Sequence, residues 1–111
     1  MSTDPTGFSI AEQERGGRAV VVPRGELDLA TAPRLDEIVQ AHLGSGQDVV
    51  VDLRELDFMD STGLRVLVAA HARARTDGTR FAITRPKEGG AVARILTIAG
   101  IDTELEFVDE P

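Results

Sequence analysis

The chain contains no cysteine. This absence excludes a disulfide framework, a thiolate metal site and a thiol nucleophile. The sequence also lacks any run of about 18 or more apolar residues, and its N-terminus lacks the basic and then apolar order of a secretory signal. We therefore expect a cytoplasmic protein that is not associated with a membrane.

Positive charge is scarce in this chain. The 19 acidic residues outnumber the 12 basic ones, which gives a formal net charge of −7. Nucleic acid and anionic membranes would be repelled over roughly a Debye length. The charge therefore argues against both as partners and favours a protein that carries a basic patch.

The remaining composition is that of a globular domain, with 41% hydrophobic and 28% charged residues. A chain of 111 residues is long enough for one core but too short for two. We expect the domain to cover residues 8–108. Residues 1–7 are small and polar and are expected to be disordered, and residues 109–111 are expected to form a flexible acidic tail.

Hydrophobic periodicity predicts five strands and three helices. The expected strands cover residues 8–14, 19–22, 48–53, 80–84 and 105–108. The expected helices cover about residues 32–43, 61–75 and 89–99. Gly16-Gly17 predicts an antiparallel hairpin, and the strand-helix-strand order after it predicts parallel neighbours. The fold class is therefore α/β, with a mixed sheet, an antiparallel edge hairpin and about three to four helices.

Two finer expectations concern Pro23 and the second helix. Pro23 has no amide hydrogen to donate, so it should lie at an edge or a bulge of the sheet. Apolar residues spread around much of the segment 64–74, which predicts a well-buried helix. Residues 54–60 are expected only to connect this helix to the strand before it.

The most informative segment is Asp60-Ser61-Thr62-Gly63-Leu64, where two hydroxyls lie at the expected start of a helix. A helix start exposes unpaired amide groups and a partial positive charge, so a phosphate attached there would find hydrogen-bond donors. Ser61 is therefore a candidate phosphate acceptor. The alternative, on residue types alone, is that Asp60, Ser61 or Thr62 only caps the helix.

Three segments resemble the STAS domain family and, within it, the stand-alone bacterial anti-sigma factor antagonists. They are Gly25-Glu26-Leu27-Asp28 with Thr31-Ala32, then Val49-Val50-Val51-Asp52-Leu53, and then Met59-Asp60-Ser61-Thr62-Gly63-Leu64. Each segment alone is weak evidence. Their order and spacing make the resemblance specific, and it extends over roughly residues 8–108.

The resemblance implies a partner-switching protein that is not an enzyme and needs no cofactor. The unphosphorylated form would bind an anti-sigma factor with serine kinase activity and so release the sigma factor. Phosphorylation at Ser61 would switch this binding off, and a serine/threonine phosphatase would restore it. Thr62 is the secondary candidate acceptor, because some members use threonine. The implied partner-binding residues are Asp28, Asp60, Ser61, Thr62, Gly63 and Leu64.

Other functions stay open at this point. A STAS scaffold in a stress-sensing complex, or an accessory subunit of a transporter, would keep the fold and change the role. A response-regulator receiver phosphorylated on Asp52 is a further alternative. It would need strand and helix to alternate from the start, an acidic pair after the first strand and a late lysine. The opening hairpin and the single lysine, Lys87, argue against it.

A metal centre is not expected. A magnesium site would need acidic oxygens that converge, and with 19 acids in the chain capping or solvated roles are favoured. His42 and His71 lie on separate expected helices with no third metal ligand nearby. The acidic residues considered for magnesium are Asp28, Asp52, Asp57 and Asp60.

Overall fold

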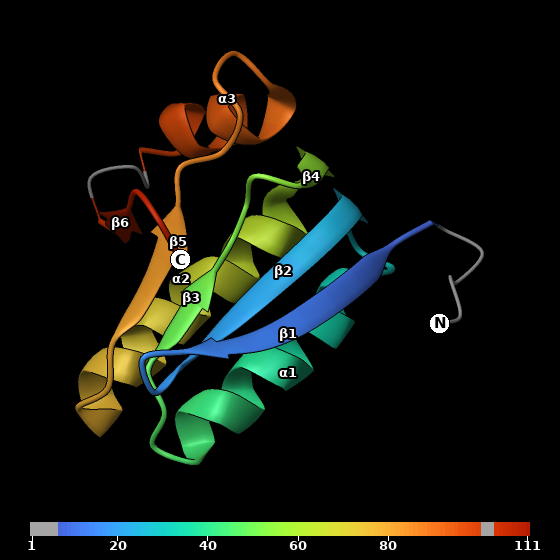
Figure 1. Cartoon of the computed structure of the whole chain (residues 1–111). Helices are drawn as coiled ribbons and strands as arrows, with labels where there is room; N and C mark the ends of the chain where they lie inside the picture. Colours follow the sequence, from blue (N-terminus) through green and yellow to red (C-terminus); the bar gives the residue numbers. More distant parts are fainter. Residues whose placement is uncertain (1–6, 101–103) are drawn as a thin grey trace.

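The strands form one mixed sheet, shown in the computed structural model of Figure 1. The structure describes residues 7–100 and 104–111. The strands are β1 (Ser9–Arg15), β2 (Arg18–Leu27), β3 (Val49–Val51), β4 (Leu56–Met59), β5 (Phe81–Thr84) and β6 (Glu106–Val108). The helices are α1 (Ala32–Gly44), α2 (Ser61–Asp77) and α3 (Ala91–Ile98). This arrangement confirms the predicted mixed α/β fold class.

The strand order is β1-β2-β3-β5-β6, and β4 pairs with β2 beyond the end of β3. β1 and β2 form the predicted antiparallel hairpin at the edge, and the other neighbours are parallel. β2 is long enough to serve two partners, because residues 19–21 pair with β3 and residues 25–27 pair with β4. The ends of β2 and β4 therefore lie side by side, and α1 and α2 begin shortly after them.

β4 is a strand that the sequence pattern does not predict. Its four residues are buried, exposed, exposed and buried in turn, so they lack the alternation that marks a half-buried strand. The strand forms because the second half of β2 would otherwise leave backbone groups unpaired beyond the end of β3. The expectation that residues 54–60 only connect β3 to the next helix is corrected by this pairing.

Pro23 lies in β2, which is an interior strand and not an edge. The carbonyl of Val21 points toward β3, beyond whose end it accepts a hydrogen bond from the amide of Asp52 at 2.8 Å. Strand positions two apart point in the same direction, so the backbone of Pro23 also faces the side of β2 on which β3 and β4 lie. The pairing with β3 ends at Val21, and the pairing with β4 begins at Gly25. Pro23 therefore falls in a gap between two ladders, where its missing amide hydrogen interrupts neither of them.

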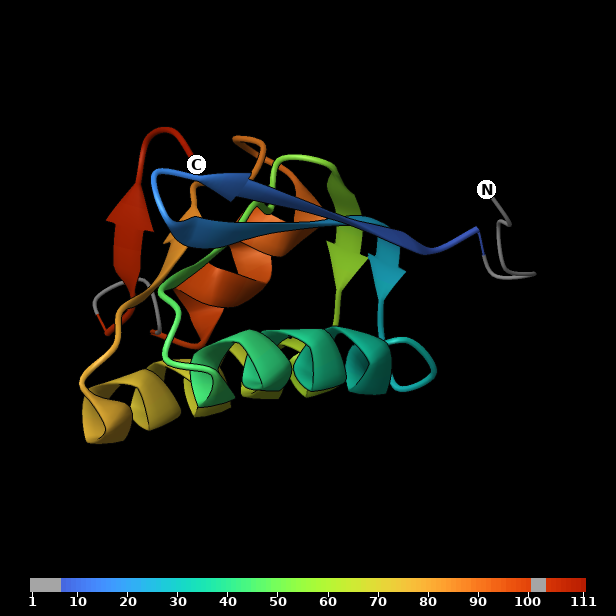
Figure 2. The same cartoon turned by 60° about the horizontal axis from the view of Figure 1, so that its bottom comes forward.

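α1 and α2 lie side by side on one face of the sheet, as Figure 2 shows. Their apolar stripes pack against β2, β3 and β5 to form the core. Its residues include Leu35, Val39 and Leu43 of α1, Leu67 and Ala70 of α2, and Val21, Val51 and Ile83 of the sheet. α3 lies apart from this pair and contacts β4. None of the described helices has the length and apolar composition needed to cross a membrane.

α2 is buried along one stripe, so the expectation of a well-buried helix is wrong. The buried positions are Gly63, Val66, Leu67, Ala70 and Ala74, which recur at helical spacing. The other apolar positions of the helix, such as Val68, Ala69 and Ala72, are exposed. Alanine is the strongest helix former, so exposed alanines stabilise the helix without belonging to the core.

Candidate functional site

The start of α2 is set by Asp60, which leaves β4 in an extended conformation with φ −103° and ψ −172°. Its carboxylate accepts hydrogen bonds from the amides of Thr62 at 2.8 Å and Gly63 at 3.3 Å. These two amides are among those that a helix start leaves without an intrahelical partner. Of the three candidate caps in the sequence, Asp60 therefore fills the role, and Ser61 is the first residue of the helix.

The two hydroxyls beside Asp60 have different surroundings. The Thr62 hydroxyl donates a hydrogen bond to the Asp60 carboxylate, and the residue is half-buried. Ser61 is exposed, and within residues 7–100 and 104–111 its side chain makes no hydrogen bond. Only the Ser61 hydroxyl is therefore both accessible and uncommitted.

Asp60 carries a fixed negative charge next to Ser61. The hydrogen bond from the Thr62 side chain lowers the pKa of the Asp60 carboxyl, and backbone amides, including that of Leu29, lower it further. Partial burial acts in the opposite direction but does not outweigh these bonds. The carboxylate is consequently ionised at neutral pH.

The segment that contains Asp28 lies next to the start of α2. The Asp60 amide donates to the carbonyl of Leu27 at 3.1 Å, and the Leu29 amide contacts the Asp60 carboxylate. The Asp28 carboxylate itself accepts the amide of Ala30 at 3.0 Å and the hydroxyl of Thr31 at 3.2 Å. Asp28 thus orders its own loop, and the structure brings that loop to the side of Ser61.

Gly63 allows the start of α2 to approach the ends of β2 and β4. A Cβ atom built on Gly63 would lie 2.7 Å from both Leu27 Cδ2 and Met59 Cγ. Both side chains are almost fully buried and have little room to move. Gly63 is itself buried and Leu64 is half-buried, so these two positions hold the helix in place behind the exposed Ser61.

Ser61 lines a shallow hollow of about 340 Å³ between β4, α2 and α3. The apolar part of its wall comes from β4 and α3, and Arg94 of α3 supplies a cation. Ile98 is 78% exposed and Phe58 is 41% exposed. The residues of this wall on β4 and α3 are Phe58, Met59, Ala91, Arg94, Ile95 and Ile98.

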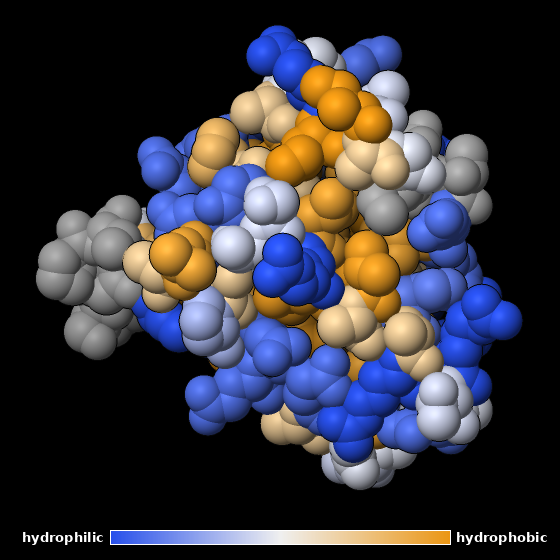
Figure 3. Space-filling view, turned by 180° about the vertical axis from the view of Figure 1, so that it is seen from behind, coloured by the Kyte–Doolittle hydropathy of each residue, from blue (hydrophilic) through white to orange (hydrophobic). Residues whose placement is uncertain are grey.

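Exposed large apolar side chains line this hollow and the loop beside Asp60. Leu29, in the loop that is bonded to Asp60, is 75% exposed. In the described part of the chain four large hydrophobic side chains are exposed, and three of them are Leu29, Phe58 and Ile98. Figure 3 shows hydrophobic residues forming a band that runs down from the α3 end of the molecule. Such a cluster is typical of a protein-binding surface.

The site residues predicted from the sequence do not include Leu29, Phe58, Arg94 or Ile98. Phe58 adjoins the predicted segment, and its exposure follows from the unpredicted strand β4. Arg94 and Ile98 reach the site only because α3 packs beside β4. One signal was available in the sequence, since Ile98 lies off the stripe of Val92 and Leu96 that α3 buries.

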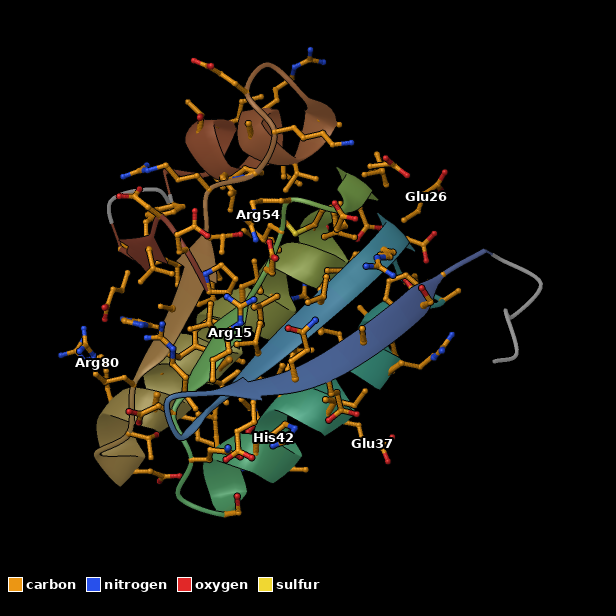
Figure 4. The ribbon with its side chains drawn as sticks, in the orientation of Figure 1. Arg15, Glu26, Glu37, His42, Arg54 and Arg80 are labelled. Carbon is orange, nitrogen blue, oxygen red and sulfur yellow. The ribbon has the colours of Figure 1, made fainter. Side chains whose placement is uncertain are left out.

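Asp52, the acid of the receiver alternative, lies in a different part of the molecule. Burial would raise the pKa of its carboxyl, but hydrogen bonds from Arg54 and Thr84 hold that pKa below its usual value. Arg15 and Arg54 line the same hollow as Asp52, on the sheet face opposite α1 and α2 (Figure 4). Asp52 therefore ties the end of β3 to β5, and its side chain is almost fully buried.

The candidate metal ligands form no cluster of three in the described part of the chain. Across residues 7–100 and 104–111, no three histidine or acidic side chains converge on a common point. His42, labelled in Figure 4, instead bonds Glu12 at 2.7 Å and Gln47 at 3.0 Å. These contacts link the last turn of α1 to the β1–β2 hairpin and its neighbouring loop.

Known proteins resemble this chain in sequence and in structure. Anti-sigma-F factor antagonist RsfB of Mycobacterium tuberculosis is 26% identical over 99 residues, which cover 88% of this chain and 79% of RsfB. The crystal structure of an anti-sigma factor antagonist from Mycobacterium paratuberculosis has a TM-score of 0.83 at 26% identity and covers 96% of this chain and 89% of that one.

A more distant likeness concerns the fold alone. The phosphorylated form of the Bacillus cell fate determinant SpoIIAA has a TM-score of 0.68 at 16% identity, and the match covers 93% of this chain and 92% of SpoIIAA.

The family model described as Mlab, STAS domain matches residues 10–109. The chain therefore belongs to the STAS domain family.

Proposed function

We propose that this protein is an anti-sigma factor antagonist whose binding is switched by phosphorylation of Ser61. The observation that carries the proposal is the exposed, uncommitted Ser61 hydroxyl in a hollow that the exposed apolar side chains of Phe58 and Ile98 also line. Two similar proteins that are 26% identical over most of the chain bear the name of anti-sigma factor antagonist. The role is one of binding and requires no catalytic residue of this chain.

In the unphosphorylated form, the cluster around Ser61 contacts an anti-sigma factor that has serine kinase activity. The contact withholds the anti-sigma factor from its sigma factor, which is thereby released. All three proteins act in the cytoplasm, where the kinase has access to ATP.

Phosphorylation adds about −1.5 to −2 charges at pH 7. The new charge lies next to the ionised Asp60 carboxylate and beside the apolar side chains of Phe58 and Ile98. Burying it against the partner costs desolvation free energy, and any acidic group of the partner is repelled. The affinity for the anti-sigma factor falls as a result, and a serine/threonine phosphatase restores it by removing the phosphate.

Ser61 is the acceptor and Thr62 is not, because the Thr62 hydroxyl is engaged by Asp60. A kinase must align the acceptor oxygen with the γ-phosphate of ATP. An exposed hydroxyl with no competing hydrogen bond meets this requirement more readily than one that must first leave a carboxylate.

The test is to incubate the purified protein with ATP and each kinase-type anti-sigma factor encoded in the source genome, and to locate any phosphate by mass spectrometry. Ser61→Ala should abolish the modification and bind the anti-sigma factor constitutively, whereas Thr62→Val should be modified like the wild type. Modification of Thr62 in the wild type would overturn the site assignment. Stable co-purification with a transport ATPase, and no binding to any anti-sigma factor, would favour the accessory-subunit role.

A further inference from the structure

α3 turns one face to the core and another to the hollow beside Ser61. Val92 and Leu96 are buried and fix the helix against the domain. Arg94 and Ile98 are four positions apart, so they share a face, and both line the hollow. The same hollow is bounded by Phe58 and Ser61 on the other side. α3 therefore contributes four of the eight residues that line this hollow.

Arg94 is a cation without an anionic partner in the part of the chain that the structure describes. The nearby Lys87 differs in this respect, because its ammonium lies 3.8 Å from the Asp57 carboxylate. An unpaired guanidinium at the wall of an apolar hollow is complementary to a carboxylate that arrives together with an apolar side chain. Arginine and large apolar side chains are also the groups that dominate binding energy at protein interfaces.

We propose that the anti-sigma factor inserts a large apolar side chain between Phe58 and Ile98 and pairs a neighbouring carboxylate with Arg94. This inference rests on the proposed function and extends its contact surface from the start of α2 onto α3. The occupant is thus a segment of the partner in which a carboxylate lies next to a large apolar side chain.

The arrangement gives the switch a second component besides repulsion. A phosphate on Ser61 would enter the hollow that Arg94 lines, and phosphate binds a guanidinium by charge-assisted hydrogen bonds. Arg94 can then pair with the phosphoserine of its own chain and is no longer available to the partner's carboxylate. Phosphorylation both adds a charge to the surface and withdraws the cation that the partner uses.

The test measures binding of the anti-sigma factor that phosphorylates Ser61, in the absence of ATP, to four variants of the full chain. Arg94→Gln should weaken binding about tenfold and Ile98→Ser at least about fivefold, as for central interface residues. Arg94→Lys should keep most of the affinity because it keeps the charge. The matched control is Arg75→Gln, an exposed arginine of α2 about 21 Å along the helix from Ser61, which should bind like the wild type.

A second measurement compares the affinities of the phosphorylated proteins for the same anti-sigma factor. The ratio of unphosphorylated to phosphorylated affinity should be smaller for Arg94→Gln than for the wild type, and unchanged for Ile98→Ser. If the wild type is phosphorylated on Ser61 by the anti-sigma factor, but unphosphorylated Arg94→Gln and Ile98→Ser bind within about twofold of the unphosphorylated wild type, the α3 surface is refuted and the proposed function stands. If the wild type binds no anti-sigma factor and is not phosphorylated, the proposed function fails and the inference fails with it.

Discussion

The Thr62 hydroxyl donates a hydrogen bond to the Asp60 carboxylate, and this bond makes the two hydroxyls at the start of α2 unequal. Asp60 caps the helix through the amides of Thr62 and Gly63 and at the same time engages the Thr62 side chain. Ser61, between them in the sequence, is left exposed. Chemistry on Ser61 can therefore proceed without breaking the cap that holds the helix.

Thr62→Val should destabilise the fold without moving the phosphate. The variant removes one hydrogen bond to a charged acceptor, which costs about 1 to 3 kcal/mol in the free energy of unfolding. Urea unfolding measures the loss, and mass spectrometry after incubation with the kinase should still find the phosphate on Ser61. Loss of phosphorylation in a folded Thr62→Val protein would show that Thr62 takes part in the reaction.

Stability should fall as the solution becomes acidic, because the pKa values of Asp52 and Asp60 are lowered in the folded state from the usual 3.8. A carboxyl with a lowered folded pKa contributes stability that is complete above its unfolded pKa. That contribution is lost as the pH falls through the folded pKa. The loss should therefore begin near pH 4 and grow below it, as followed by urea unfolding at a series of pH values.

Asp60→Asn isolates the contribution of the Asp60 charge, since asparagine caps a helix about as well as aspartate. Its unfolding free energy should depend less steeply on pH below about 4 than that of the wild type. Identical slopes for the two proteins would contradict the assignment of a lowered pKa to Asp60.

Gly63→Ala should destabilise the protein by about 1 to 3 kcal/mol, the usual range for inserting a methyl group into a packed core. The added Cβ would collide with the buried Leu27 and Met59 side chains. Gly44→Ala is the matched control, because there the nearest atom is the end of the Arg73 side chain at 3.1 Å, which can move. Equal thermal stability of the two variants would show that the approach of α2 to β2 and β4 is looser than described.

Leu29→Ser should weaken binding to the anti-sigma factor by at least about fivefold and leave the stability almost unchanged. The side chain is 75% exposed, so its removal costs the fold less than about 0.5 kcal/mol. Titration calorimetry and a melting curve on the same sample separate the two effects. Unaltered affinity would exclude the loop beside Asp60 from the contact surface.

Local signals in the sequence predict much of this fold. Gly16-Gly17 marks the hairpin turn, Pro33 marks the first turn of α1, and Gly78 ends α2 with a φ of 78°. Each of these depends on the backbone preferences of the residues themselves. β4 could not be predicted in this way, because it exists only where β2 extends beyond β3.

The candidate site likewise has one part that local sequence signals predict and another that depends on tertiary packing. Ser61 and Asp60 are adjacent in the sequence, and the helix that follows them identifies them as a cap and a first helical residue. Arg94 and Ile98 meet Ser61 only through the packing of α3 beside β4. No periodicity within α3 specifies where that helix will dock, so its part in the site becomes visible only in three dimensions.

Switching by Ser61 is tested by measuring the affinity of one anti-sigma factor for the unmodified protein and for the same protein carrying phosphate on Ser61. The phosphorylated form should bind more weakly by about 5- to 150-fold or more, the usual range for coupling between a modification and a binding event. Equal affinities of the two forms would contradict this switching.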